Sequence, residues 1–320
     1  MKLRYYSALC AAIATIGLSS STAFAKDNLM LGYADPETSI FGKAAIAFSE
    51  KLTELSNGQM TVNMFPNATL GTIQEMPAML QQGTCDVTLI VTSSLTDLVP
   101  DLGVFDMPFL FDSYDSARAK INGEAGKIMA GKLDEQNMHL GSWLTMGFRE
   151  VTSKKPINSL KDFEGLKIRV QPNEVHQEIF KSLKAAPTVI NFSELYAAME
   201  QGTVDAQENP YVNIYNNTYY EVQKYLTETN HVFQVAALVM SKSTYDEFTD
   251  EQKKWVDEAA AYAADVEWKA TVEDNEIAKK GCIGKGMIFT KLDHAALLES
   301  TKGVYDKYKD RYGKLVDLLK

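Results

Sequence analysis

Apolar and polar positions in the first part of the chain predict strands that alternate with helices. Short apolar runs predict the strands, and apolar residues that recur every three to four positions predict the helices between them. The predicted order is strand, helix, strand, helix, strand, at residues 29–33, 41–55, 60–65, 73–82 and 87–91. This order favours an α/β domain whose ligand-binding groups lie at the carboxyl ends of its strands.

A second alternating set begins near residue 148. Strands are predicted at residues 148–152, 166–170, 188–190 and 231–240, with helices at 174–183 and 193–201. Thr249 and Gln252 then form a capping-box signal for a helix that continues to about Lys280. Roughly 30 residues at 1.5 Å each give about 45 Å, which is longer than a small domain is wide. This helix is therefore expected to span two domains, before a strand at 287–289 and a last helix from His294.

These elements predict a division into two α/β domains built from interleaved segments. The first domain is expected to hold residues 26–146 and 235–276, and the second to hold residues 147–234 and 277–320. Residues 100–111 (PDLGVFDMPFLF) interrupt the alternation with a dense apolar segment. We expect this segment to pack in the core, as most apolar runs do.

The first 25 residues have the pattern of a cleaved secretory signal. Lys2 and Arg4 precede an apolar run at residues 9–18, and Ala23-Phe24-Ala25 supplies the small residues before a cleavage site. The run is too short for a membrane span of roughly 20 residues. A lipoprotein signal is not expected, because Leu9 stands directly before Cys10. The mature protein should therefore begin at Lys26, outside the cytoplasm.

Composition excludes several classes of function. Removal of the signal shifts the formal net charge from −10 to −12, and such acidity argues against nucleic-acid binding. Four histidines show no metal-binding spacing and no G-x-S-x-G elbow occurs in the mature chain, so we expect no enzyme, no metal and no cofactor. Cys85 and Cys282 could form one disulfide, but two isolated thiols are the favoured interpretation.

Two arginines and an asparagine on separate segments are the candidate site. A guanidinium offers a rigid fork of donors that matches a carboxylate, and an asparagine amide adds a neutral donor. Arg169 ends a predicted strand, where it either pairs with a structural carboxylate or holds an anionic ligand. Arg149 alone could equally be a surface charge, and Asn209, which precedes Pro210, could equally form a turn. The pattern predicts a site for an organic acid.

The order of these motifs resembles the substrate-binding proteins of tripartite ATP-independent periplasmic (TRAP) transporters, of the C4-dicarboxylate-binding type. The motifs are 165–170 (GLKIRV), 205–210 (DAQENP), 147–153 (GFREVTS), 65–71 (FPNATLG), 108–111 (PFLF) and 220–231 (YEVQKYLTETNH). The resemblance implies a clamshell of two domains with a long helix across both. It also implies that Arg169 holds the ligand carboxylate, that Arg149 and Asn209 contact the ligand, and that Phe192 lies against it. The implied partners are a small and a large integral membrane subunit, with the protein itself a periplasmic monomer.

The first domain is expected to contact the rest of the ligand. Sialate binders of this family carry a polar residue and a carboxylate where this chain has Ala34 and Val91, so sialate is not expected. The remaining candidates are Asp35, Glu37, Thr92 and Ser93 at the strand ends and Glu75 on the next helix, each of which could instead be a cap or surface residue. Hydroxyl-rich neighbours favour a hydroxylated monocarboxylate such as an aldonate or uronate. A C4-dicarboxylate ligand, or service to a sensor instead of a transporter, remain the alternatives.

Overall fold

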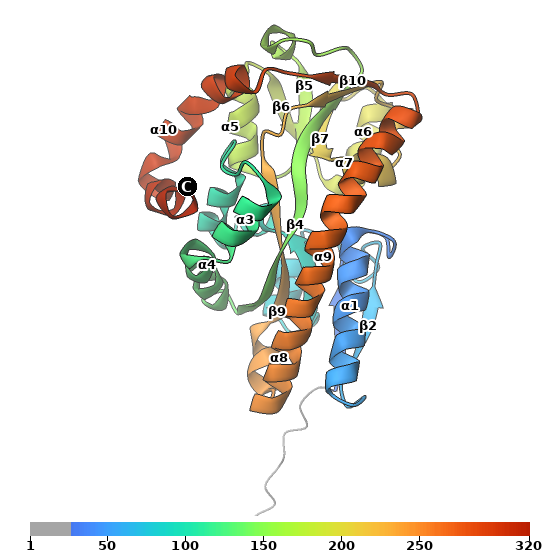
Figure 1. Ribbon diagram of the computed structural model, residues 1–320, viewed down its shortest axis with the longest axis vertical. Coiled ribbons are helices and arrows are strands. Elements are labelled where there is room, and N and C mark those ends of the chain that lie inside the picture. The colour runs from blue at the N-terminus through green and yellow to red at the C-terminus, as the bar shows by residue number, and fades with distance from the viewer. Residues whose placement is uncertain (1–26) are drawn as a thin grey trace, which may run out of the picture.

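The computed structural model describes residues 27–320, so the signal peptide expected at residues 1–25 lies outside the described residues. The chain forms an α/β fold in two parts, which Figure 1 shows one above the other with a long helix along one side. The sheet order is β2-β1-β3-β9-β4-β7-β5-β6, with β8 and β10 branching from β4. The strands are β1 (Asn28–Gly32), β2 (Thr61–Phe65), β3 (Val87–Val91), β4 (Met138–Ser153), β5 (Lys167–Val170), β6 (Ala186–Val189), β7 (Ala206–Pro210), β8 (Tyr225–Glu228), β9 (Phe233–Ser241) and β10 (Ile288–Lys291).

Helices cover both parts of the sheet. The helices are α1 (Ile40–Leu55), α2 (Met76–Gln81), α3 (Tyr114–Ile121), α4 (Glu124–Asp134), α5 (Glu174–Ser182), α6 (Leu195–Glu200), α7 (Tyr211–Asn216), α8 (Lys242–Glu247), α9 (Asp250–Gly284) and α10 (His294–Leu319). Short 3-10 helices are η1 (Thr92–Leu95), η2 (Pro100–Asp106), η3 (Leu160–Phe163), η4 (Phe192–Glu194) and η5 (Tyr219–Glu221). The predicted mixed α/β class is confirmed.

Strand β4 connects the two parts of the sheet. Its first part, Met138–Phe148, pairs antiparallel with β9, and its last part, Arg149–Ser153, pairs antiparallel with β7. A register shift at Gly147 marks the crossing, where the backbone has a φ of +87°. A Cβ on this residue would lie 2.3 Å from Tyr114 Oη, so only glycine fits both the conformation and the space. The crossing delivers the residues after Gly147 to the second part of the sheet.

The long helix α9 spans both parts, as predicted. Thr249 and Gln252 form the expected capping box, and the helix runs 35 residues to Gly284, four beyond the predicted end. Figure 1 shows α9 passing beside α1 at one end and α7 at the other. Its buried face carries small residues at Ala259, Ala260 and Ala263, which allow the helix to pack closely on its neighbours.

Helix α10 contacts elements of both predicted domains. Tyr312 Oη donates to Pro100 O at 2.9 Å, and Arg311 Nη1 donates to Glu174 Oε1 of α5 at 2.8 Å. The segment 100–111 was expected to pack in the core, and most of its residues are buried, with Phe105 fully covered. Cys282 is a free buried thiol, so no disulfide joins it to Cys85. The assignment of residues 277–320 to the second domain stays a prediction.

Candidate functional site

A pocket lies between the two parts of the sheet. Residues after β1 and on β3 form one wall, and residues of β4, β5 and β7 form the other. The empty space between its lining atoms, open solvent included, is about 550 Å³. Its polar lining residues are Asp35, Gln74, Ser94, Arg149, Arg169, Gln171, Asn209 and Asn213.

Arg169 projects from β5 and is 2% exposed. Its Nε donates to Ile190 O at 2.9 Å, which fixes the base of the guanidinium. Within residues 27–320, no carboxylate lies within ion-pair distance of Arg169. Burial lowers the pKa of Arg169 to about 10, with Glu208 acting in the opposite direction, so the group stays charged at neutral pH. A buried charge without a carboxylate partner is costly, and a ligand anion would supply that partner.

Arg149 lines the same pocket but already has a partner. Its Nε and Nη2 donate to the two carboxylate oxygens of Glu208, the second at 2.9 Å. Its Nη2 also donates to Glu208 O at 2.6 Å, and its Nη1 donates to Gln234 Oε1 at 2.7 Å. This bidentate pairing matches the guanidinium's charge with a fully buried carboxylate. Arg149 is therefore held in place before any ligand enters.

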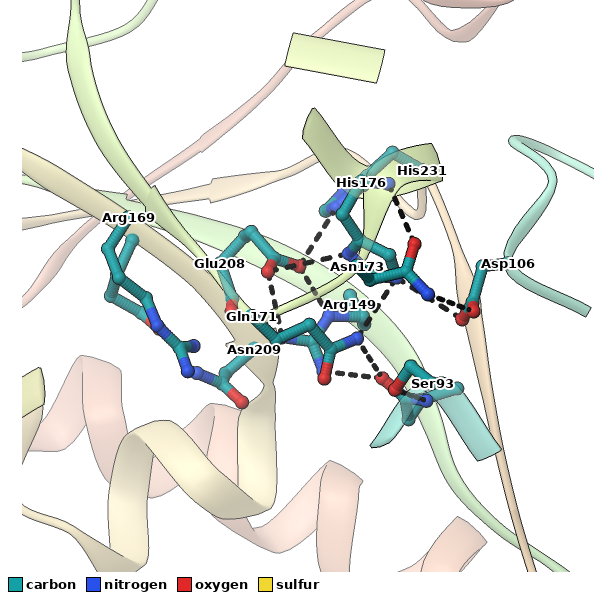
Figure 2. A network of polar contacts seen from close by, with 12 residues as sticks. Ser93, Asp106, Arg149, Arg169, Gln171, Asn173, His176, Glu208, Asn209 and His231 are labelled. Carbon is teal, nitrogen blue, oxygen red and sulfur yellow. Dashed lines mark hydrogen bonds and ion pairs between the residues drawn. The ribbon is translucent and has the colours of Figure 1, made fainter. Parts of the chain in front are cut away.

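Glu208 is the centre of a buried polar network, drawn in Figure 2. His231 Nε2 lies 3.2 Å from Glu208 Oε2, and His176 Nδ1 lies 3.6 Å from Oε1. Burial alone would raise the pKa of the Glu208 carboxyl. The charges of Arg149 and His176 lower this pKa by more than burial raises it, so the net pKa is well below the ordinary value. Burial lowers the pKa of His176, yet Glu208 and Asp106 outweigh it, and the net pKa is raised. The network thus holds Glu208 ionised.

The network also joins η2 to α5. Asp106, which ends η2, accepts from Asn173 Nδ2 at 2.9 Å and lies 3.2 Å from His176 Nε2. Asn173 is the N-cap of α5, and its Oδ1 accepts from the backbone N–H of Val175 and His176. These contacts place α5 against η2, so that the Glu208 network is shared by segments of both predicted domains.

Asn209 lies near the end of β7, directly across from Glu150 of β4. Its Nδ2 donates to Gln207 Oε1 at 2.6 Å, and its Oδ1 accepts from Asn213 Nδ2 at 3.2 Å. Figure 2 shows the Arg169 guanidinium extending toward the Asn209 amide. Asn209 therefore belongs to a strand rather than to a turn, and it lines the pocket beside the unpaired guanidinium.

Some residues expected from the sequence are on the pocket wall. Asp35 lies there and is 7% exposed, and burial raises the pKa of its carboxyl to about 6. Phe192, in η4, also lines the pocket and is half-buried. With Arg149, Arg169 and Asn209, these residues come from five separate segments that the fold brings together. Their contact with a ligand stays a prediction.

Three expected residues, Glu75, Thr92 and Ser93, are not among the residues that line the pocket, and their contact with a ligand stays a prediction. The exposed Glu75 accepts from Thr72 N and Oγ1, both at 2.8 Å, and so closes the turn before α2. Thr92 Oγ1 donates to Val235 O at 3.1 Å, and Ser93 Oγ accepts from Gln234 Nε2 at 3.2 Å. Both side chains are buried in this packing. The 3-10 helix η1 rotates the chain after β3, and this places the next residue, Ser94, on the wall instead.

Sequence reasoning missed four polar residues of the wall. These are Gln74, Ser94, Gln171 and Asn213. One of them follows the strand periodicity, because Gln171 lies two residues after Arg169, on the same side of the extended chain. Asn213 is on α7, after β7 has ended, and no periodicity relates it to Asn209.

Within residues 27–320, no group of three or more His, Cys, Asp or Glu side chains is arranged to hold a metal ion. In the same range, every helix is too short or too polar to cross a bilayer.

Comparison with known proteins identifies the family. Residues 31–311 match the sequence profile of bacterial extracellular solute-binding protein, family 7. The chain belongs to this family. The expected kinship with TRAP solute-binding proteins and the two-domain solute-binding fold are thereby confirmed.

Several known proteins resemble this chain over most of its length. The sugar acid binding protein of Advenella mimigardefordensis, solved with galactonate, is 32% identical, with a TM-score of 0.88 over 91% of this chain and 97% of that one. A TRAP solute-binding protein of Polaromonas, solved with D-erythronate, is 30% identical, with a TM-score of 0.89 over 92% and 98%. The C4-dicarboxylate-binding periplasmic protein of Rhodobacter capsulatus is 30% identical over 85% of this chain and 83% of its own length.

Proposed function

We propose that this protein captures a hydroxylated monocarboxylate, such as an aldonate or uronate, for a TRAP transporter. The observation that carries this proposal is the charge of the pocket. Among the described lining residues there are two cations, and one of them, Arg149, is matched by Glu208. Arg169 alone has no carboxylate partner within residues 27–320, so the pocket has one positive charge to offer an anion. That balance suits a ligand with one carboxylate.

The rest of the wall supports a ligand that carries hydroxyl groups. Asp35, Gln74 and Ser94 offer oxygen and nitrogen atoms on the side opposite Arg169, and Asn209 offers an amide beside it. The Asp35 carboxyl would repel a second ligand carboxylate but accept a hydrogen bond from a hydroxyl. Phe41, Ile73 and Phe192 line the space between and would contact the carbon chain. Two relatives were solved with galactonate and D-erythronate, which both combine one carboxylate with several hydroxyls.

The alternative ligand is a C4-dicarboxylate, because the Rhodobacter capsulatus relative is named for binding one. A second carboxylate would have to share Arg149 with Glu208, whose two oxygens already occupy its Nε and Nη2. Removing either partner from such a buried pair is strongly unfavourable. The pairing of Arg149 therefore favours the monocarboxylate.

The remaining parts of the proposal concern location and partners. The family is described as extracellular, and the signal pattern supports a periplasmic location after cleavage before Lys26. There it would deliver its ligand to a small and a large integral membrane subunit, without chemical change to the ligand. A mass measured on periplasmic protein that corresponds to a chain starting at Lys26 would support the location, whereas an intact N-terminus in the cytosol would contradict it.

A thermal-shift screen with the mature protein tests the ligand class. Galactonate, D-erythronate, galacturonate and succinate are compared at matched ionic strength. A ligand present at roughly 100 times its Kd stabilises by about 2.7 kcal/mol. We expect one or more of the hydroxylated monocarboxylates to raise the melting temperature and succinate to have little effect. Stabilisation by succinate alone would establish the dicarboxylate alternative, and incubation of the bound acid with the protein should leave it unchanged.

A further inference from the structure

A second pocket lies on the other face of β4, away from the organic-acid pocket. Its volume is about 460 Å³, within the roughly 300–1,000 Å³ range of small-molecule sites. Arg149 and Glu150 are neighbours on β4, so their side chains point to opposite faces of the strand. Arg149 lines the organic-acid pocket, and Glu150 lines the second one, which we call the rear pocket.

Within residues 27–320, only one of the two carboxyl oxygens of Glu150 has hydrogen-bond partners. The side chain is fully buried, and Oε2 accepts from the backbone N–H of Thr229 and, at 3.0 Å, of Asn230. Oε1 is also buried, and it has no hydrogen-bond partner within residues 27–320. A buried carboxyl oxygen without a partner is destabilising whether the group is ionised or protonated. Burial raises the pKa of Glu150 to about 8, which agrees with this position.

The surroundings of Glu150 suit a positively charged partner. Tyr114 and Phe148 line the rear pocket and form an edge-to-face pair, with ring centroids 5.5 Å apart. Aromatic faces attract cations, and Lys279 Nζ already lies 5.4 Å from the ring centroid of Tyr211 in the same pocket. Lys279 is bound to Glu228, so its charge is already matched. Asp112 and Glu276 add further negative charge to the lining.

We propose that the rear pocket binds a small primary organic ammonium ion, which donates an N–H to Glu150 Oε1 and lays its charge and carbon chain against Tyr114 and Phe148. When Glu150 is ionised, a primary ammonium supplies the missing donor hydrogen, and its positive charge favours this ionised form against the effect of burial. Its alkyl group matches the apolar part of the lining, to which Phe111 also contributes. The site is separate from the organic-acid pocket and does not depend on the function proposed for that pocket.

Ligand-detected saturation-transfer NMR with the mature protein tests this site. Propylammonium chloride is titrated into the wild type, and 1-propanol and sodium chloride are titrated separately as the uncharged and the inorganic probes. We expect saturable binding of propylammonium, little signal from 1-propanol, and no displacement of propylammonium by an equal concentration of sodium chloride. Absence of saturable propylammonium binding, equal binding of 1-propanol, or full displacement by sodium would each overturn the proposal.

Two variants place the binding at the rear pocket. Glu150→Gln keeps an oxygen for the Thr229 and Asn230 N–H groups but places an NH2 donor near the ammonium, so propylammonium should bind at least about tenfold more weakly. Tyr114→Leu removes one ring of the wall and should also weaken binding, which tests the site independently if Glu150→Gln does not fold. The matched control Glu164→Gln, on an exposed carboxylate that pairs with Lys184, should bind as the wild type does. Unchanged affinity in a folded Glu150→Gln or Tyr114→Leu variant would contradict the assignment.

Discussion

Arg149 and Arg169 line the same pocket, but within residues 27–320 only Arg149 is paired with a carboxylate, that of Glu208. The two arginines therefore have different roles. The pairing fixes Arg149 and removes its net charge from the pocket, whereas Arg169 is tied only through Nε to the backbone oxygen of Ile190. We therefore expect Arg149 to build the wall and Arg169 to offer its charge to the ligand.

Because Arg149 and Glu208 form a buried pair, substitution of Glu208 should lower the free energy of unfolding far more than substitution of a surface carboxylate. Glu208→Gln leaves the Arg149 charge uncompensated in the interior and should destabilise the ligand-free protein by about 3–5 kcal/mol. Glu164→Gln breaks an exposed pair with Lys184 and should change the unfolding free energy by less than about 1 kcal/mol. Urea unfolding measures both. Equal effects of the two substitutions would show that the Arg149–Glu208 pair does not stabilise the fold.

Glu267 predicts how stability depends on pH. This residue of α9 is fully buried against β4, where it accepts from Thr145 N and, at 3.0 Å, from Thr271 Oγ1. Burial raises the pKa of its carboxyl from 4.5 to about 8. The folded state therefore holds this proton more tightly than the unfolded state, so the stabilisation is present below pH 4.5 and is lost as pH rises toward 8.

The variant Glu267→Gln tests this contribution. An uncharged amide removes the proton uptake, so the variant should lose less stability than the wild type between pH 5 and about 8. Near pH 8, the loss in unfolding free energy should differ between the wild type and the variant by on the order of a few kcal/mol. Urea unfolding across this pH range measures it, and identical pH profiles would mean that Glu267 does not titrate in the folded protein.

The pocket's position between two walls predicts closure on ligand binding. Four of the expected contacts, Arg149, Arg169, Phe192 and Asn209, lie on one side, and the crossings of β4 near Met146 and of β9 near Gln234 are the expected hinges. Because the ligand binds the closed form preferentially, its addition should shift the population toward that form. The helix α9, whose Asn275 Nδ2 donates to Met146 O at 3.0 Å, would bend with the hinge.

Distance labels on the two domains measure this motion. Cysteines introduced as Glu54→Cys on α1 and Lys161→Cys on η3 lie on exposed positions of the two predicted domains. The native Cys85 and Cys282 are buried and should react slowly with the label. A saturating ligand should shorten the label distance and lower the radius of gyration in small-angle scattering. No change in either quantity at saturation would contradict the hinge mechanism.

The sequence predicted those parts of the fold that have a regular apolar pattern. The strand β3, with its run VTLIV, and the capped helix α9 lie close to where the pattern predicted them. The strand β7 could not be found in this way, because its residues AQENP are mostly polar yet all buried. Their burial depends on partners far along the chain, such as Arg149 for Glu208, and periodicity contains no information about such pairs.

The candidate site was also predictable only in part, because some of the residues that line the pocket were expected from the sequence and others were not. The strand position of Arg169 left open whether it pairs with a structural carboxylate or holds an anionic ligand, and the resemblance to TRAP binding proteins favoured the ligand. Arg169 lines the pocket. The sequence could not predict that Ser94, and not Thr92 or Ser93, lines the pocket. Which residue does so depends on the tight turn of η1 directly after β3. Local backbone geometry decides which of three adjacent small polar residues points inward.

Calorimetry with an acid found in the thermal-shift screen tests the central claim, that Arg169 holds the ligand carboxylate. Arg169→Ala should weaken binding by about 2–5 kcal/mol, roughly 30- to 5,000-fold, because the ligand anion loses a desolvated, bidentate partner. Arg169→Lys should also bind poorly, since a point charge does not reproduce the guanidinium fork. Lys167→Ala, at an exposed position of the same strand, is the matched control and should bind normally. Near-normal affinity in a folded Arg169→Ala variant would contradict the account.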